Sequence, residues 1–338
     1  MKIHPIAWLI WLVTVLVVVS LVRNPIYLFL ILLWLVIVKR TVAAEHCDVI
    51  SIWRFAGVVL VTTTVFNALA VHVGETVLFR LPLFGSAITL EAAFYGLVNG
   101  LILTLMFIAF TIVSQALPAR ALIRVIPRAF YPVAVVIAIA LSFVPATRRH
   151  FEQIREAQAV RGHQWRGVRD WLPLLIPLLT GGMERALQLA EAMTARGFAS
   201  QSGYDVRSQI AVVLGLALLL SGWLLWLVWS FPTIGVIFFF TGVVVIGVTI
   251  RVVGLGIPYS CYRSQAWQRG DSLVSFSAVV VLALFAFDWL DRSSIFYSPY
   301  PAITVPSFRP SVALLSAGLV VPAWVTQGKG RGGRGSAE

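Results

Sequence analysis

Long apolar runs separated by short polar stretches constrain this chain more than any other feature of its sequence. An α-helix needs about 20 apolar residues to cross the hydrocarbon core of a bilayer, and several of the runs reach that length. The pattern therefore predicts an all-α fold, a polytopic membrane helix bundle. The runs occupy residues 6–22, 26–38, 51–73, 88–116, 129–147, 208–230, 233–254, 272–290 and 310–324.

The composition agrees with a membrane protein. Only 12% of the 338 residues are charged, against about 25% in soluble domains. The net charge of +12 is expected to reflect cytoplasmic loops and anionic lipid rather than nucleic-acid binding. The two cysteines, Cys47 and Cys261, indicate neither a disulfide framework nor a metal cluster. Residues 1–22 lack the small-residue cleavage site of a signal peptide, so we expect a retained first helix.

Basic residues orient the later spans, because loops rich in lysine and arginine stay in the cytoplasm. Segment 148–206, the loop between Arg251 and Arg269, and the tail after residue 326 are all basic. Four spans after residue 206 place these three segments on the cytoplasmic side.

The first five runs cannot be oriented by the same rule. Lys39–Arg40 and the stretch from Arg120 to Arg128 also look cytoplasmic. With segment 148–206 in the cytoplasm, neither of them can be cytoplasmic if all five runs cross completely. One of the five must therefore be re-entrant, shallow or interfacial, and the sequence leaves open which one.

These patterns divide the chain into four regions. We expect an N-terminal transmembrane region (1–147), cytoplasmic amphipathic helices (148–206) and a C-terminal transmembrane region (207–325). The glycine-rich basic tail (326–338) is expected to be disordered.

Segment 148–206 differs from the rest of the chain because it holds eight arginines and six acidic residues, 14 of the 40 charged residues. It contains the skeleton Glu-Ala-three residues-Arg-Gly twice, ending at Gly162 and Gly197. In each copy the apolar spacing predicts an amphipathic helix that stops at the glycine.

The repeated arginine has two readings. An arginine in the last turn complements the helix dipole, which is worth about 0.3–1 kcal/mol, and this accounts for either copy alone. The pairing favours a second reading, in which each arginine enters an acidic groove on a partner and bonds bidentately to a carboxylate. Such a partner has two similar grooves, as a pseudo-symmetric dimer does.

The segments AQAVRG (157–162) and AEAMTARGF (190–198) resemble the two Ala-Arg-Gly signatures of the transmembrane (T) component of energy-coupling factor (ECF) transporters, the EcfT/CbiQ family. The resemblance covers roughly residues 50–205. Val160 departs from the family pattern, in which alanine is common at this position.

This resemblance implies a multi-pass protein of the plasma membrane with no catalytic site and no cofactor. It implies two ATP-binding-cassette (ABC) ATPases of the same or different kind, and one substrate-binding S component that takes up a vitamin or a transition-metal ion. The coupling helices are expected in the cytoplasm. The implied contacts to the ATPases are Arg161 and Arg196, with Gly162 and Gly197 ending the helices and Ala159 and Ala195 beside the arginines.

Three further features have simpler readings. Gly96 and Gly100 form a GxxxG motif that permits close helix packing within the chain, with contact to the S component as the alternative. Glu91 follows Thr89 at a helix start, where the dipole stabilises a carboxylate. His150 and His163 flank the first amphipathic helix without the acidic or cysteine neighbours that a metal site needs.

Two other functions compete with this interpretation. A self-sufficient secondary transporter usually carries ionisable residues at the bilayer midplane, where this chain has few charges. A membrane-embedded enzyme needs a cluster of catalytic side chains, and the sequence contains no nucleophile–base set. The sequence names neither the substrate nor the ATPases.

Overall fold

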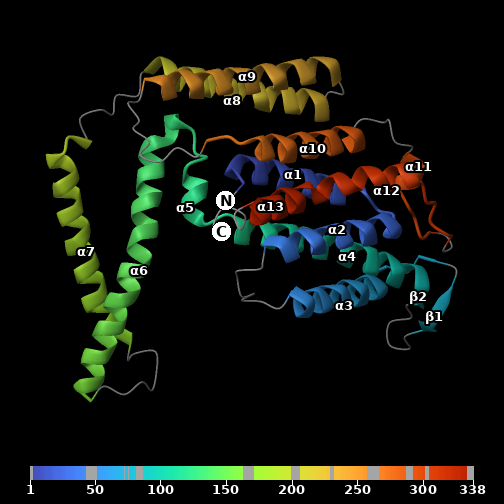
Figure 1. The fold of residues 1–338 in the computed structure, drawn as a ribbon, viewed down its shortest axis with the longest axis horizontal. Coiled ribbons are helices and arrows are strands. Elements are labelled where there is room, and N and C mark those ends of the chain that lie inside the picture. Colours follow the sequence, from blue (N-terminus) through green and yellow to red (C-terminus); the bar gives the residue numbers. More distant parts are fainter. Residues whose placement is uncertain are drawn as a thin grey trace. The chain divides into compact units, whose positions relative to one another are not determined.

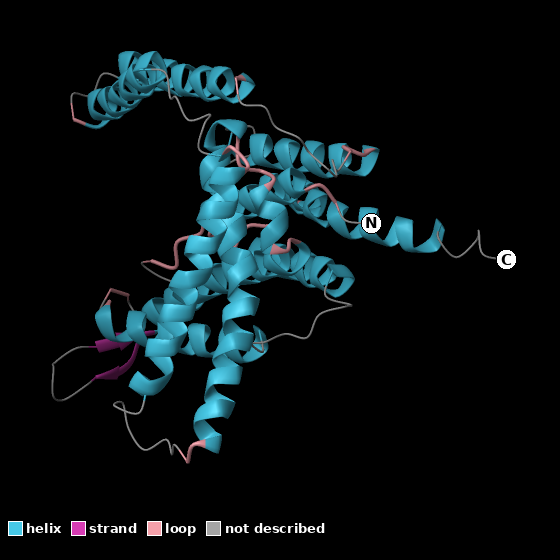
Figure 2. Cartoon of the chain, turned by 90° about the vertical axis from the view of Figure 1, so that its left-hand side faces the viewer, coloured by secondary structure: helices cyan, strands magenta, loops and turns pink. Residues whose placement is uncertain are grey.

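The computed structural model is predominantly helical (Figures 1 and 2). It divides into two compact units, Met1–Leu122 with Arg263–Glu338 (unit 1) and Ile123–Tyr262 (unit 2). The structure describes residues 3–42, 52–71, 73–74, 76–80, 87–162, 171–198, 206–228, 232–256, 266–286, 292–300 and 304–332.

Each predicted apolar run overlaps at least one helix, which confirms the expected fold class. In unit 1 the helices are α1 (Pro5–Leu21), α2 (Pro25–Val42), α3 (Ile52–Ala70), α4 (Leu90–Ala116), α10 (Arg269–Ala286), α11 (Arg292–Ile295), α12 (Pro310–Ser316) and α13 (Val321–Gly332), with α5 (Ala119–Ile123) at the boundary. A short hairpin of β1 (Val77–Arg80) and β2 (Ala87–Thr89) precedes α4.

Length and hydropathy make five helical stretches candidates for membrane spans. They are α2, α4, residues Arg128–Val160, α8 (Val206–Leu227) and Thr233–Leu255 within α9 (Pro232–Leu255). Shorter apolar helices cover Pro5–Leu21, Arg54–Ala70 and Pro310–Thr326. A membrane protein follows from these helices.

The helix α13 continues to Gly332. Residues 326–332 of the expected disordered tail are therefore helical in backbone, and residues 333–338 lie outside the described part.

The C-terminal helices of unit 1 are built into its N-terminal hairpin. The backbone N–H of His4 donates to Asp271 Oδ1 at 3.0 Å, and Thr14 Oγ1 donates to the carbonyl of Ala278 at 3.3 Å. The later residue of the α1 segment, Thr14, contacts the later residue of α10, Ala278, so α1 and α10 run in the same direction. Trp34 Nε1 donates to Ser316 Oγ at 3.1 Å, one of several contacts between α2 and α12.

The turn between α1 and α2 holds α11 and the loop before α12. Asn24 is 1% exposed, and its side-chain N–H groups donate to the carbonyls of Ser294 and Ser307, both at 2.9 Å. Arg309 donates its backbone N–H to the Tyr27 hydroxyl at 2.8 Å. Tyr27 and Arg309 lie at the starts of α2 and α12, so these two helices are also parallel.

The GxxxG motif seats α3 against α4. A Cβ at Gly96 would come within 2.8 Å of the Thr63 carbonyl oxygen, and one at Gly100 would come within 3.1 Å of Leu60 Cα. The rings of Phe55 on α3 and Phe107 on α4 stack 3.8 Å apart. Both glycines therefore serve packing inside the chain, the simpler of the two readings.

The start of α4 also has the expected cap. Thr89 Oγ1 accepts from the backbone N–H of Ala92 at 3.4 Å. Glu91 is 1% exposed and accepts from the backbone N–H of Thr76 at 3.1 Å, so this carboxylate ties the segment before β1 to the helix start. Burial, then the nearby Tyr95 and Glu91, raise the pKa of Tyr300 in the loop before α12.

Unit 2 contains two helical hairpins. The first is formed by α6 (Tyr131–Val160) and α7 (Leu172–Ala195), the second by α8 and α9, and the short 3-10 turn η2 (Arg128–Phe130) leads into α6.

Glycines set the close approach of α8 and α9. A Cβ at Gly222 would lie 2.7 Å from the carbonyl oxygen of Gly235, and one at Gly242 would lie 2.8 Å from that of Gly215. Large apolar side chains such as Phe240, 63% exposed, cover the outer surface of the hairpin. Small inner and large outer residues are the pattern of a helix pair packed within lipid.

Candidate functional site

The two Arg-Gly repeats fold into the same helix end. Arg161 caps α6 with φ −78° and ψ 6°, and Arg196 caps α7 with φ −87° and ψ 5°. The following glycines are left-handed, Gly162 at φ 80° and Gly197 at φ 75°. Glycine adopts this conformation without a Cβ penalty, which explains why both helices stop here as predicted.

The cap hydrogen bonds also correspond. Gly162 donates its N–H to the Ala159 carbonyl at 3.0 Å, and Gly197 donates to that of Thr194 at 2.9 Å. Sequence repetition has therefore produced structural repetition at these two positions.

Both arginine side chains, Arg161 and Arg196, are exposed at the helix ends. The flanking Ala159 and Ala195 are exposed as well. Within the described residues, neither guanidinium has a hydrogen-bond or ion-pair partner. Each is therefore available to a carboxylate of another protein, although the exposed Arg155 and Arg185 in mid-helix share this property.

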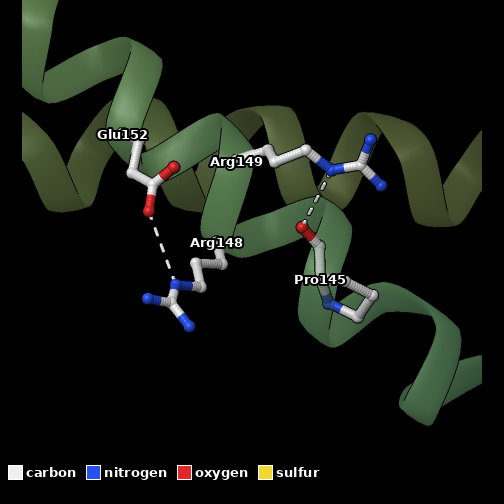
Figure 3. A network of polar contacts seen from close by, with 4 residues as sticks. All are labelled: Pro145, Arg148, Arg149 and Glu152. Carbon is white, nitrogen blue, oxygen red and sulfur yellow. Dashed lines mark hydrogen bonds and ion pairs between the residues drawn. The ribbon is translucent and has the colours of Figure 1, made fainter.

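Two other arginines of α6, Arg148 and Arg149, are engaged within their own helix (Figure 3). Arg148 Nε lies 3.4 Å from Glu152 Oε1, and Arg149 Nε donates to the Pro145 carbonyl at 3.3 Å. An exposed i,i+4 pair contributes only about 0.3–0.5 kcal/mol. Their effect is to hold these side chains along the helix.

The two predicted amphipathic helices are parts of longer helices. The one that stops at Gly162 is the second half of α6, and α7 begins at Leu172, before Pro177 and the GGMER stretch. Pro145 and Pro177 lie inside these helices. Each helix thus joins an apolar half to a charged half.

The two helices run antiparallel, as Figure 1 also shows. The ring of Tyr131 lies 6.4 Å from that of Phe198, and a Cβ at Gly181 would lie 2.9 Å from His150 Nε2. At 1.5 Å per residue, the 30 residues of α6 span about 45 Å. Arg161 and Arg196 therefore lie at opposite ends of this hairpin, on the order of 40 Å apart.

This pairing sets charged residues beside apolar ones. Since Tyr131 faces Phe198 and His150 faces Gly181, the charged half of α7 lies along residues 131–147 of α6. The exposed charged residues of that half are Glu184, Arg185, Glu191 and Arg196.

No group of three or more histidine, cysteine or acidic residues that could hold a metal occurs among the described residues. Cys47, Cys261 and His163 lie outside that part of the chain.

Comparison with known proteins identifies the family. The model of the family described as CbiQ, cobalt transport protein, matches residues 2–205. This chain belongs to the CbiQ family. The match includes both Arg-Gly helix ends, whereas α8 to α13 lie beyond it.

Curated relatives of this CbiQ protein are named energy-coupling factor transporter transmembrane protein EcfT. The protein from Leuconostoc gelidum is 32% identical over 153 residues, 41% of this chain and 57% of the relative. The one from Bacillus subtilis is 28% identical over 128 residues, 32% of this chain and 48% of the relative. The chain thus spans about half the length of these relatives.

Two contacts in the CbiQ chain could not be predicted from its sequence. Neither the ring contact between Phe198 and Tyr131 nor the seat of Gly254 against η2 was predicted. The sequence shows Phe198 after the second Arg-Gly repeat and Tyr131 near the start of the apolar run 129–147, but only the antiparallel fold brings the two rings together.

Proposed function

We propose that this protein transmits the conformational change of two ABC ATPases to an S component, which then imports its substrate. Arg161 and Arg196 each dock in an acidic groove of one ATPase. The supporting observation is the pair of identical helix ends with exposed, unpaired guanidinium groups.

The separation of the two ends supports two separate grooves. A single groove cannot receive arginines on the order of 40 Å apart on one antiparallel hairpin. Two grooves at such a spacing fit two ATPase subunits side by side, each of which accepts one helix end.

The docking helices belong in the cytoplasm, and charge supports this location. Inserting residues 131–147 into hydrocarbon would carry the charged half of α7 with them, at about 2.5–3.5 kcal/mol for each charged residue. We therefore infer that α6 is the one among the first five apolar runs that does not cross. Lys39–Arg40, the stretch from Arg120 to Arg128 and segment 148–206 then all share the cytoplasmic side.

Helix direction in unit 1 supports the same topology independently. Because α1 and α10 are parallel, an odd number of crossings must lie between them. The helices α2, α3, α4, α8 and α9 meet this condition, and a crossing by α6 alone would break it. Both termini are then cytoplasmic, with the Asn24 turn on the outer side.

The choice of the substrate to test rests on the family alone. The matching family is described as a cobalt transport protein, so cobalt(II) is the first substrate to test, followed by vitamins. Specificity resides in the S component. A second candidate function, ion-driven transport by this chain alone, gains no support from the buried charged residues Glu91 and Asp271, since both lie in the first turn of a helix.

The test is the double variant Arg161→Ala/Arg196→Ala, with Arg155→Ala/Arg185→Ala as the control. Removing one side of a desolvated interfacial charge pair costs about 2–5 kcal/mol. We expect the first variant to insert normally but to lose the co-purifying ATPases and substrate uptake, and the control to keep both. A double variant that retains a stoichiometric ATPase complex and normal uptake rules out the proposal.

A further inference from the structure

We propose that the end of α7, the start of α6 and the end of α9 form a joint that carries movement of Arg196 to the α8–α9 hairpin. The inference rests on the proposed coupling role and adds the membrane element that one ATPase moves. All of its parts lie in unit 2.

The first contact of the joint ties the second Arg-Gly end to α6. Phe198 follows Arg196 and Gly197 directly, and its ring lies 6.4 Å from that of Tyr131 at 45°. Tyr131 is the first residue of α6. Aromatic pairs in such tilted arrangements contribute about 0.5–1.5 kcal/mol beyond their buried area. A displacement of Arg196 therefore acts on the start of α6.

The second contact ties the start of α6 to the membrane hairpin. The turn η2 leads directly into Tyr131, and its Ala129 is 6% exposed. Gly254, in the last turn of α9, faces this turn. A Cβ at Gly254 would lie 3.3 Å from both Ala129 N and Arg128 Cβ, so the backbones are in direct contact without room for a larger side chain.

The α8–α9 hairpin is packed closely enough to move as one body with the turn η2. The backbones of α8 and α9 touch at the Gly222–Gly235 and Gly215–Gly242 positions. Closely packed elements transmit a shift rather than absorb it. Since α8 and α9 lie beyond residues 2–205, this hairpin adds a driven part to the matched family region.

The two docking ends therefore have different tasks. Arg196 lies beside the joint, whereas Arg161 lies at the far end of α6, about 45 Å along the helix. We assign the movement of α8–α9 to the Arg196 end.

Spatial contiguity alone does not establish coupling, so the test measures the joint directly. Spin labels at Gln188→Cys on α7 and Val244→Cys on α9 report the distance across it, with Cys47 and Cys261 replaced by serine. The protein is measured with its ATPases, both nucleotide-free and trapped with ATP and vanadate.

In the otherwise unchanged chain we expect one narrow distance that is the same in both states, because the labelled parts move together. Gly254→Leu should lose this narrow distance. Gly247→Leu, on the same helix, should keep it, because a Cβ at Gly247 meets nothing within 4 Å. A distance that shifts with nucleotide, or a Gly254→Leu distribution equal to that of Gly247→Leu, overturns the joint.

A second pair of variants guards against a folding defect. Phe198→Ala should broaden the distance, and Phe198→Tyr, which keeps the ring, should restore it. If both variants give the distance distribution of the unchanged chain, the Phe198–Tyr131 contact does not transmit the movement. Failure of any ATPase to co-purify with the unchanged chain would instead reject the proposed function, and the nucleotide-free distances would still test the joint.

Discussion

The side-chain amide of Asn24 donates a hydrogen bond to the carbonyl of Ser307, 283 residues further along the chain. A second bond from the same amide reaches the carbonyl of Ser294. One residue in the turn between α1 and α2 thus holds both α11 and the loop that precedes α12.

Replacing Asn24 by aspartate should destabilise unit 1. Aspartate keeps the oxygen that accepts from the Ile26 N–H at 3.0 Å, but it cannot donate to the two carbonyls. Leaving buried acceptors unpaired costs about 1–3 kcal/mol, and we expect a lower midpoint of thermal unfolding in detergent, followed by tryptophan fluorescence. An unchanged midpoint would show that these bonds add no net stability.

Gly96→Leu should separate α3 from α4, because a Cβ there meets the Thr63 carbonyl at 2.8 Å. Cysteines in place of Phe55 and Phe107, whose rings stack, should form a disulfide efficiently in the parent chain and poorly in the variant. Gly57→Leu is the control, since a Cβ at Gly57 has open space. Equal cross-linking in all three would contradict the packing role of the motif.

Gly162→Ala should loosen the end of α6 without a steric clash. A Cβ at this position meets nothing within 4 Å, so the cost comes from the left-handed backbone alone. This cost is about 1–2 kcal/mol. Faster hydrogen exchange of the amides of Arg161 and Gly162 is the expected signature, and Gly162→Asn should exchange more slowly than Gly162→Ala. Identical exchange in all three chains would argue that the cap conformation is not required.

Accessibility to a membrane-impermeant thiol reagent tests whether α6 differs from the helices that we propose to span the membrane. In a background without Cys47 and Cys261, Ser142→Cys on the apolar half of α6 should react from the cytoplasmic side. Val244→Cys, which is 60% exposed on α9 in the absence of lipid, should stay protected by the bilayer. Protection of Ser142→Cys to the same degree would return residues 131–147 to the hydrocarbon core.

Much of the fold could be predicted from the sequence because lipid imposes a simple rule on apolar length. Every predicted run overlaps a helix. The Arg-Gly repeat predicted both helix ends, because the left-handed conformation of a glycine depends on local sequence. The pairing of α6 with α7 is not local. The run 129–147 was as apolar as a membrane span, and only the antiparallel arrangement, with Arg196 near Tyr131, reveals charged neighbours along it.

The structure also corrected the extent of single elements. The amphipathic helix predicted to end at Gly197 is part of a longer helix, because α7 begins at Leu172 and runs through Pro177. Thr180 Oγ1 donates to the carbonyls of Ile176 and Pro177 at 3.0 and 3.1 Å within this turn.

The parallel packing of α1 with α10 has a consequence for biosynthesis. Between Val42 and Arg269 the ribosome adds more than two hundred residues, which at about 5–20 residues per second takes on the order of ten seconds to under a minute. During that interval Thr14 and Asn24 have no access to their partners. Newly inserted N-terminal helices must therefore wait in the bilayer, and a membrane chaperone or insertase that shelters their polar groups would set the yield of assembled protein.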